Sequence, residues 1–236
     1  MKADVVLLPK DLAAGQDDLV VVLDVLRATT SLTVALAAGA REIRIFDDVE
    51  GARRAAAGFG GAKLLAGEAQ CLPPAGFDLG NSPAGFAACA GATVFMATTN
   101  GTRAIVAAQG AKTVLIGALV NAGAVAKRLL QLRGDVKLLC AGTNGQVAME
   151  DVIGAGAVLN ALRYAADIDL ASDIARMALG LFRAAADDLH DALAQSQGGQ
   201  NVINAGLPAD VEFAARLNSI PVVGVVEREP LRVVRA

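Results

Sequence analysis

Aromatic side chains, histidine and cysteine are scarce in this chain of 236 residues. It contains no tryptophan, one histidine and only 3% aromatic residues. Its three cysteines, Cys71, Cys89 and Cys140, are far apart and show no CxxC spacing. That pattern excludes a disulfide scaffold and a zinc or redox motif. We therefore interpret the cysteines as reduced thiols of a cytoplasmic protein.

The chain also lacks a strong charge of either sign and any long apolar run. Its 21 basic and 24 acidic side chains give a formal net charge of -3, with no basic stripe, so nucleic acid is not an expected partner. The apolar stretches are interrupted well before the roughly 18 residues that a membrane span requires. The first residues do not have the basic and apolar regions of a signal peptide. We expect a soluble, cytoplasmic protein with no membrane partner.

Several catalytic motifs are missing as well. The only histidine, His190, lies in the polar stretch Asp187–Asp191, which predicts an exposed position on a helix. A Ser-His-Asp or Cys-His mechanism is therefore not expected. No complete GxGxxG or GxxxxGK[ST] motif occurs, so the sequence supports neither a dinucleotide-binding fold nor a P-loop.

Short β-branched runs and alanine-rich segments of helical spacing alternate along the chain. Because most of the runs show no polar alternation, they are typical of parallel strands buried on both faces. The expected strands are 5–8, 19–23, 43–46, 63–65, 93–96, 113–116, 136–139 and 222–226. Helical segments include 31–38, 49–57, 121–132 and 151–165. This order predicts a layered α/β fold whose mostly parallel sheet carries helices on both faces.

The last third of the chain has a different pattern. From about 167 to 217 the strands stop and helical pattern dominates, with a glycine-rich turn expected at 196–200. The glycine- and proline-rich stretch 67–83 predicts a long ordered loop, and loops of that length are usually functional. We expect one α/β domain over 1–236, either undivided or formed by two closely packed lobes, with a helix-rich part at about 150–220.

Three of the expected strands are followed by polar turns that lead into helices. The turns are 24–30, 97–103 and 140–145. In a parallel sheet these turns share the carboxyl edge, where open α/β folds bind ligands. Unpaired N–H groups at helix starts, with Arg27 and Arg103, suit a phosphate or carboxylate. The alternative is that threonine and asparagine in these turns only cap helices.

Acidic side chains follow the same strands or lie in the adjoining loops. They are Asp24, Glu68, Asp78, Glu150 and Asp151. Carboxylates beside an anion site, without a histidine or cysteine cluster, indicate Mg²⁺ rather than zinc or a redox metal. For Glu150 and Asp151 a purely structural role is the alternative, because acids are favoured in a first helical turn.

Four ordered motifs identify a family. DVLRATT at 24–30, GFDLGNSP at 76–83, TTNGTRA at 98–104 and CAGTNG at 140–145, followed by Glu150-Asp151, together resemble the 2-phosphosulfolactate phosphatase family. The segment 206–215 is also similar to the C-terminal region of that family, so the resemblance covers nearly the whole chain. It implies a Mg²⁺-dependent hydrolase that converts 2-phospho-3-sulfolactate to 3-sulfolactate, a step of coenzyme M biosynthesis.

The resemblance also implies site residues. The expected groups are catalytic Asp24, Arg27 and Arg103; substrate-binding Asn81, Ser82, Thr99, Asn100, Gly101, Thr102, Thr143, Asn144 and Gly145; and metal-binding Asp24, Glu68, Glu150 and Asp151. Whether Asp24 acts as nucleophile, base or metal ligand stays open. The expected partner is a small anionic phosphorylated substrate, with a homodimer left open.

Two departures from the family pattern bear on the substrate. Glu68 is followed by Ala69-Gln70-Cys71, where members often have a basic residue, and 196–200 reads Ser-Gln-Gly-Gly-Gln instead of containing His and Arg. Both changes remove positive charge, so a smaller phosphorylated 2-hydroxy acid is an alternative substrate. A non-catalytic binding protein or sensor for phosphorylated acids is the alternative function.

Overall fold

The computed structural model describes residues 1–13, 15 and 18–236. The strands are β1 (Lys2–Val6), β2 (Leu19–Leu23), β3 (Glu42–Phe46), β4 (Lys63–Gly67), β5 (Thr93–Ala97), β6 (Thr113–Gly117), β7 (Val136–Cys140), β8 (Asp169–Leu170), β9 (Gly224–Arg228) and β10 (Leu231–Arg235). The α-helices are α1 (Ala28–Ala37), α2 (Val49–Ala57), α3 (Gly101–Ala107), α4 (Ala122–Leu132), α5 (Met149–Ala165), α6 (Asp173–Ala185), α7 (Leu189–Gln195), α8 (Gln197–Asn204) and α9 (Pro208–Ala214). Short 3-10 helices are η1 (Pro9–Asp11), η2 (Pro83–Ala88), η3 (Ala108–Gly110) and η4 (Leu119–Asn121).

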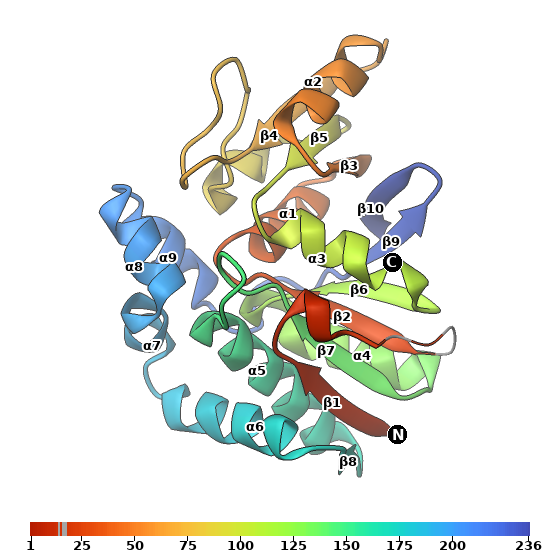
Figure 1. Ribbon diagram of the computed structural model, residues 1–236, viewed down its shortest axis with the longest axis vertical. Coiled ribbons are helices and arrows are strands. Elements are labelled where there is room, and N and C mark those ends of the chain that lie inside the picture. The colour runs from red at the N-terminus through yellow and green to blue at the C-terminus, as the bar shows by residue number, and fades with distance from the viewer. Residues whose placement is uncertain (14, 16–17) are drawn as a thin grey trace.

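The strands of the described residues form one ten-stranded sheet in the order β4-β5-β3-β10-β9-β6-β2-β7-β1-β8 (Figure 1). Most neighbouring pairs are parallel, and the predicted layered α/β class is confirmed. None of the helices described is both long enough and apolar enough to cross a membrane.

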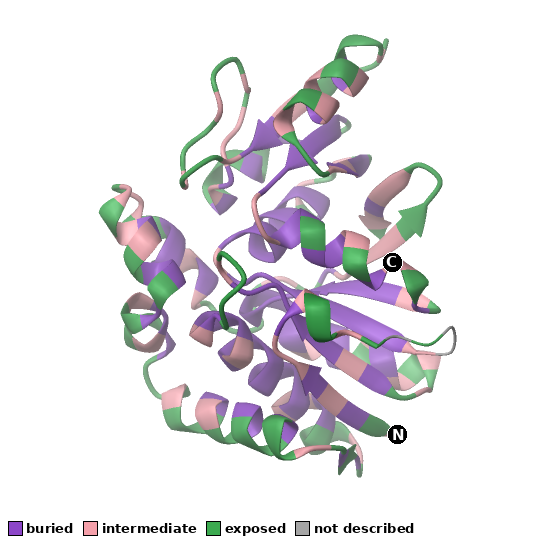
Figure 2. Cartoon of the chain, viewed as in Figure 1, coloured by how far each residue is buried: buried purple, intermediate pink, exposed green. Residues whose placement is uncertain are grey.

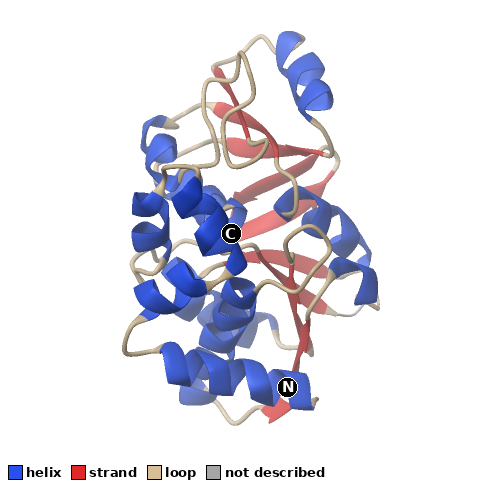
Figure 3. Cartoon of the chain, turned by 60° about the vertical axis from the view of Figure 1, so that its left-hand side comes forward, coloured by secondary structure: helices blue, strands red, loops and turns tan. Residues whose placement is uncertain are grey.

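Strand β2 shows why the central strands read as continuous apolar runs. Val20 and Val22 belong to one buried cluster, which includes side chains of α1 and α3. Leu19, Val21 and Leu23 belong to the other, which includes side chains of α4, α5 and α6. A strand covered on both faces has no polar alternation to show. Figure 2 shows the central strands almost entirely buried, and Figure 3 shows helices on both sides of the sheet.

The sheet consists of two parallel groups that run in opposite directions. Strands β3, β4 and β5 form one group, and β1, β2, β6, β7 and β8 form the other. The antiparallel hairpin β9-β10 lies between them and pairs antiparallel with both β3 and β6. The expectation that the three polar turns share one carboxyl edge of a single parallel sheet is therefore wrong, because β5 and β2 run in opposite senses.

Sheet twist nevertheless brings these strand ends together. Four strands separate β5 from β2, and neighbouring strands rotate by about 20 to 25° each, so the five steps add up to roughly 100 to 125°. Figure 3 shows the strand direction turning along the sheet. Two opposed strands that are rotated this far have carboxyl ends that face a common space.

The last third of the chain differs from its prediction in three places. The expected turn at 196–200 is the start of α8, because Ser196 caps that helix and its hydroxyl accepts a hydrogen bond from Gly199 N–H at 3.0 Å. A two-residue strand, β8, lies in the segment expected to have none, and it extends the sheet beside β1. The strand expected at 222–226 occupies Gly224–Arg228 and is followed by β10, which the sequence reading did not include.

Candidate active site

A cavity of about 630 Å³ opens where the carboxyl ends of the two strand groups meet. The loops after β2, β4, β5 and β7 line it, and α8 closes one side. The lining residues used below are Asp24, Arg27, Glu68, Gln70, Cys71, Asn81, Thr99, Asn100, Thr143, Asn144, Gly198, Asn201 and Asn204. All three polar turns singled out in the sequence thus contribute to the same cavity.

Asp24 lies directly after β2 and is almost fully buried. Its Oδ1 accepts a hydrogen bond from Ala28 N–H at 3.1 Å, at the start of α1. Its backbone is held by Thr29, whose hydroxyl donates to the Asp24 carbonyl at 2.9 Å. A Cβ atom at Gly101 would lie 2.7 Å from Asp24 Oδ2, so only glycine lets the start of α3 approach this carboxylate.

The electrostatic surroundings of Asp24 oppose its negative charge. Burial, together with the nearby carboxylates Glu68 and Glu150, raises its pKa to about 7, against the hydrogen bond from Ala28. Arg27 acts in the opposite direction. A carboxyl group in such surroundings is stabilised in its charged form by any cation that enters the cavity.

Glu68 connects the loop after β4 to the loop after β5. Its Oε1 accepts hydrogen bonds from the backbone N–H of Thr99 at 3.0 Å and from the Thr99 hydroxyl at 2.6 Å. Its Oε2 accepts from Cys71 N–H at 3.0 Å. These bonds fix the carboxylate at the cavity wall and join two loops from the same strand group.

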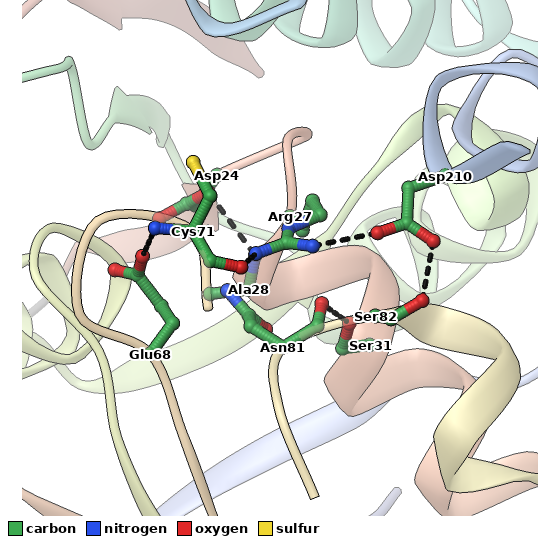
Figure 4. Close-up of polar contacts among 9 residues, drawn as sticks. All are labelled: Asp24, Arg27, Ala28, Ser31, Glu68, Cys71, Asn81, Ser82 and Asp210. Carbon is green, nitrogen blue, oxygen red and sulfur yellow. Dashed lines mark hydrogen bonds and ion pairs between the residues drawn. The ribbon is translucent and has the colours of Figure 1, made fainter. Parts of the chain in front are cut away.

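Arg27 is the only cationic side chain among the described residues that line the cavity, and it is 3% exposed. Its guanidinium donates to Asp210 Oδ2 and to the Cys71 carbonyl oxygen, both at 2.6 Å (Figure 4). Ser82 donates its hydroxyl hydrogen bond to the other oxygen of Asp210. Asp210, from α9, therefore balances the charge of Arg27 and links it to the long loop.

Asp151 joins two loops beneath the cavity. Its Oδ1 accepts from Val25 N–H at 2.8 Å, and its Oδ2 accepts from Gly142 N–H at 3.0 Å. Burial, together with the charges of Asp24 and Glu150, raises the pKa of this carboxyl well above its usual value. Because each oxygen already holds a backbone N–H, the geometry fits a positioning role better than direct contact with a ligand.

Glu150 has a buried oxygen that lacks a partner. In the described part of the chain, its Oε2 has no hydrogen bond. The carboxylate lies against the first turn of α8, where a Cβ atom at Gly198 would come within 1.8 Å of Oε1. Burial raises the pKa of Glu150, and hydrogen bonds from its own backbone N–H, Ser196 and Gly198 lower it. Gly198 lines the cavity, so Glu150 lies just behind its wall.

Asn81 presents a second buried oxygen without a partner. Its backbone carbonyl accepts from the Ser31 hydroxyl at 2.8 Å, which fixes the end of the long loop against α1 (Figure 4). Its side-chain Oδ1 is buried and has no hydrogen bond within the described structure. Since buried polar atoms are normally paired, the amide of Asn81 is a group that a ligand in the cavity would satisfy.

Several residues expected at the site do not line this cavity. They are Ser82, Gly101, Thr102, Arg103, Gly145, Glu150 and Asp151. Thr102 is buried and donates its hydroxyl hydrogen bond to the Thr98 carbonyl at 2.8 Å, which makes it part of the turn. Arg103 is exposed on α3 and lines a neighbouring cavity, which shares Glu68 and Thr99 with the main one. Its catalytic role stays a prediction.

Several residues that line the cavity or hold its lining residues were not singled out from the sequence. Asp210 lies in the 206–215 segment that resembles the family, but no local pattern indicated that it would pair with Arg27. Asn201 and Asn204 come from α8, and Gln70 from the loop after β4. The local sequence does not show whether an asparagine on a helix lines a cavity or lies on the outer surface of the protein.

The carboxylates are not gathered as a preformed metal cage. Among the residues described, no group of three or more His, Cys, Asp or Glu side chains is arranged to hold a metal ion. Mg²⁺ does not need such a cage, because it usually keeps several waters and takes one or two carboxylates plus phosphate oxygens. The buried, unpaired Oε2 of Glu150 and the carboxylate of Asp24 provide hard oxygen donors of the kind that Mg²⁺ prefers.

Comparisons with known proteins place this geometry in a family. A family model described as 2-phosphosulpholactate phosphatase matches residues 6–229. A protein of Carboxydothermus hydrogenoformans named probable 2-phosphosulfolactate phosphatase is 42% identical over 223 residues, which cover 94% of this chain and 92% of the relative. Proteins of the same name from Deinococcus radiodurans (41% identical over 206 residues, 86% of this chain and 85% of the relative) and Symbiobacterium thermophilum (38% over 223 residues, 92% and 94%) are also similar.

The family predicted from the four motifs is therefore confirmed, and with it the class of enzyme, a phosphoric monoester hydrolase. The match includes every loop that lines the cavity, from Asp24 to Asn204. By its sequence along nearly its whole length, the chain belongs to the 2-phosphosulpholactate phosphatase family.

Proposed function

We propose that this protein is a Mg²⁺-dependent phosphohydrolase that releases inorganic phosphate from a small phosphorylated 2-hydroxy acid. The names of its relatives point to 2-phospho-3-sulfolactate as such a substrate, with 3-sulfolactate as the product. The observation that carries the proposal is a cavity in which Asp24 and Glu68 have no ion-pair partner among the described residues, while Arg27 lies in the same wall. Carboxylates that face an anionic substrate require a cation between them.

Asp24, Glu68 and Glu150 would hold the metal. Asp24 and Glu68 line the cavity, and Glu150 lies just behind the wall at Gly198, with its buried Oε2 unpaired among the described residues. A bound Mg²⁺ would neutralise charge on the phosphoryl group as the ester bond breaks. Asp151, which the sequence also suggested as a ligand, would act one step further out, because it fixes the loops that carry Asp24 and Thr143.

The remaining groups would bind and orient the ester. Arg27 would donate to a phosphate oxygen from the side of its guanidinium that faces the cavity, since Asp210 and the Cys71 carbonyl hold it rigidly. Asn81 would donate or accept through its unpaired amide. Asp24 would direct a water molecule at phosphorus or attack phosphorus itself, and both roles need the carboxylate in its ionised form.

Phosphate release measured with and without metal tests this proposal. With 2-phospho-3-sulfolactate and other phosphorylated 2-hydroxy acids as substrates, we expect turnover in the presence of Mg²⁺ and loss of turnover in excess EDTA, restored by added Mg²⁺. Full activity in EDTA would remove the metal from the mechanism. Binding of these esters without phosphate release would instead favour the sensor or binding-protein alternative.

A further inference from the structure

A second cavity, of about 590 Å³, shares no lining residue with the candidate active site. Residues of α4 form one wall, and the segment 218–223, which leads into β9, forms the other. Asn218 holds this segment against the start of α4, because its side-chain Oδ1 accepts a hydrogen bond from Gly123 N–H at 2.7 Å. Ile220 N–H donates to the Val120 carbonyl at 2.9 Å. The two walls are therefore fixed relative to each other at one end of the cavity.

Lysine and arginine side chains set the charge of this second cavity. Lys127 and Arg128 come from α4 and Arg235 from the end of β10, and no acidic side chain lines the cavity in the described structure. None of the three cations has an ion-pair partner among the residues described. By contrast, Arg232 in the same strand as Arg235 contacts two carboxylates at 2.6 Å each. Cations that share a cavity without a counter-charge repel one another, and an anion relieves that repulsion.

Arg128 has a donor nitrogen that neither water nor protein satisfies. Its Nε is buried and makes no hydrogen bond within the described part of the chain. The Arg128 side chain donates one hydrogen bond among these residues, from Nη1 to Gln131 Oε1 at 3.3 Å. Buried polar atoms are normally paired, and an arginine on an ordinary exposed helix face would keep its guanidinium nitrogens in water. An anion in the cavity would provide the acceptor that Arg128 lacks.

The segment that forms the other wall is largely apolar. Residues 220–223 read Ile-Pro-Val-Val, and all four line the cavity. Ala124 adds an apolar side chain from α4, and Gln131 and Asn218 add neutral amides. An inorganic anion would contact the cations alone. An organic anion would also place its carbon skeleton against residues 220–223, and burying that apolar surface is favourable.

We propose that this second cavity binds a small organic anion that carries at least two carboxylate or phosphate groups. Three cations without ion-pair partners among the described residues match two or three negative charges, and the apolar wall matches the carbon skeleton that joins those charges. The volume of about 590 Å³ lies within the range typical of small-molecule sites. The proposal goes beyond hydrolysis of a phosphate ester, because no residue of this site lines the active-site cavity.

Calorimetric titration with citrate tests the site. Citrate has three carboxylates and no phosphate ester, so a phosphohydrolase does not consume it. In metal-free buffer the carboxylates of Asp24 and Glu68 make the active-site cavity unfavourable for such an anion. We expect one citrate to bind per chain, with a Kd below about 1 mM at low ionic strength. Acetate, which has one carboxylate, should bind at least about tenfold more weakly, because two fewer charges face the cations.

Variants that remove one charge each locate the binding. Lys127→Gln and Arg235→Gln change exposed residues, so both should fold normally, and each should weaken citrate binding by about fivefold, the effect of one unit charge at about 4 Å in water. Arg128→Gln should weaken it at least as much, and the triple variant should show no binding. Arg41→Gln, at an exposed position outside the cavity, is the matched control and should stay within twofold of the parent protein. Urea denaturation checks that every variant is folded.

Three results would overturn the proposal. The first is the absence of citrate binding to the parent protein at millimolar concentration. The second is citrate binding that persists in the triple variant, since the anion would then occupy another site. The third is acetate that binds as tightly as citrate, because the cations would then attract any anion without forming a site for several charges. Citrate binding that is weakened by each of the three substitutions, and not by Arg41→Gln, would support the proposal.

Discussion

The carboxylate of Glu42 in the sheet and the carboxylates of Asp24 and Glu68 at the cavity differ in the cations that face them. Glu42, at the start of β3, accepts hydrogen bonds from Arg44 Nε at 2.7 Å and from Arg232 Nη1 at 2.6 Å. At the cavity, Asp24 and Glu68 are held by backbone N–H groups and by a threonine, and no ion pair involves them in the described structure. The fold therefore pairs Glu42 with two arginines, whereas a cation for the site carboxylates is part of the proposed function.

The pKa values of Glu42 and Asp24 differ in the same way as their cationic surroundings. For Glu42, burial raises the pKa, but hydrogen bonds and charges from Arg44 and Arg232 outweigh it and hold the pKa below its ordinary value of 4.5. For Asp24, burial dominates and the pKa rises to about 7. The difference shows that burial alone does not mark a functional carboxylate. A buried carboxylate without a cationic partner is the better candidate for a functional group.

The largest expected effect is on stability, and it comes from breaking the ion pair between Arg27 and Asp210 at the site. Asp210→Ala would leave the guanidinium of Arg27 buried and uncompensated, and breaking a buried ion pair typically costs about 3 to 5 kcal/mol of unfolding free energy. Urea denaturation measures this loss. The exposed pair of Asp173 and Arg176 provides the control, since Asp173→Ala should cost less than about 1 kcal/mol.

Combining the substitutions shows whether the pair acts as a unit. Arg27→Ala with Asp210→Ala should cost less than the sum of the two single variants, because the double variant leaves no uncompensated charge. Additive losses of unfolding free energy would mean that Arg27 and Asp210 stabilise the fold independently. The ion pair would then not explain why Arg27 is buried.

The next effect is on catalysis and comes from an unneutralised carboxylate. Asp24→Asn keeps the shape of the side chain but removes the charge that would hold a cation, so kcat should fall by about 100- to 1000-fold. The free energy of unfolding should change little, because burial already opposes that charge. Phosphate release and urea denaturation on the same preparation provide both readouts. Near-normal turnover in this variant would return Asp24 to a structural role.

A smaller effect is expected at Arg103, which the sequence placed in the catalytic group. Because Arg103 is exposed and lines the neighbouring cavity, Arg103→Ala should lower kcat/KM by about tenfold, the lower end of what an arginine–phosphate contact provides. Thermal stability should hardly change. Arg54→Ala, in the same opening, is the matched control and should stay within twofold of the parent protein. An early-melting Arg103→Ala variant with full activity would make this arginine structural.

The smallest effect concerns the neutralised carboxylate of the sheet. Because the pKa of Glu42 is lowered in the folded state, its contribution to stability is present above about pH 4.5 and is lost as the pH falls through the folded value. Glu42→Gln should therefore reduce stability near pH 7 by about 1 kcal/mol, and the difference from the parent protein should shrink as the pH falls from 4.5 toward 3. Denaturation across that range measures it. If the stability difference between Glu42→Gln and the parent protein stayed constant with pH, the ionised Glu42 carboxylate would not be stabilised by the two arginines.

The sequence predicted the strands and the acids that follow them for one physical reason. A strand buried on both faces, such as β2, is a continuous apolar run, and the first polar residue after it, Asp24, lies at the strand end. Glu68 likewise follows the apolar end of β4. Local pattern is sufficient for such positions.

The rest of the site depends on contacts between distant segments. The partner of Arg27 is Asp210, 183 residues away, and nothing in either local sequence records the pairing. The reversal between the two strand groups depends on where β9 and β10 insert, and that position is set by pairing with the distant strands β3 and β6. The sequence predicts a turn at the start of α8, because Gly198 and Gly199 are typical turn residues. The structure instead has a helix there, capped by Ser196.

The position of β9 and β10 has a consequence for how the molecule is made. These two strands are the last in the sequence, yet they lie between β3 and β6 in the middle of the sheet. We therefore expect that during synthesis no strand-to-strand hydrogen bonds join the two strand groups until β9 and β10 have emerged from the ribosome. A chain that ends at residue 223 should remain sensitive to protease in the segments that connect the two strand groups. A chain that extends through residue 235 should be resistant in both groups.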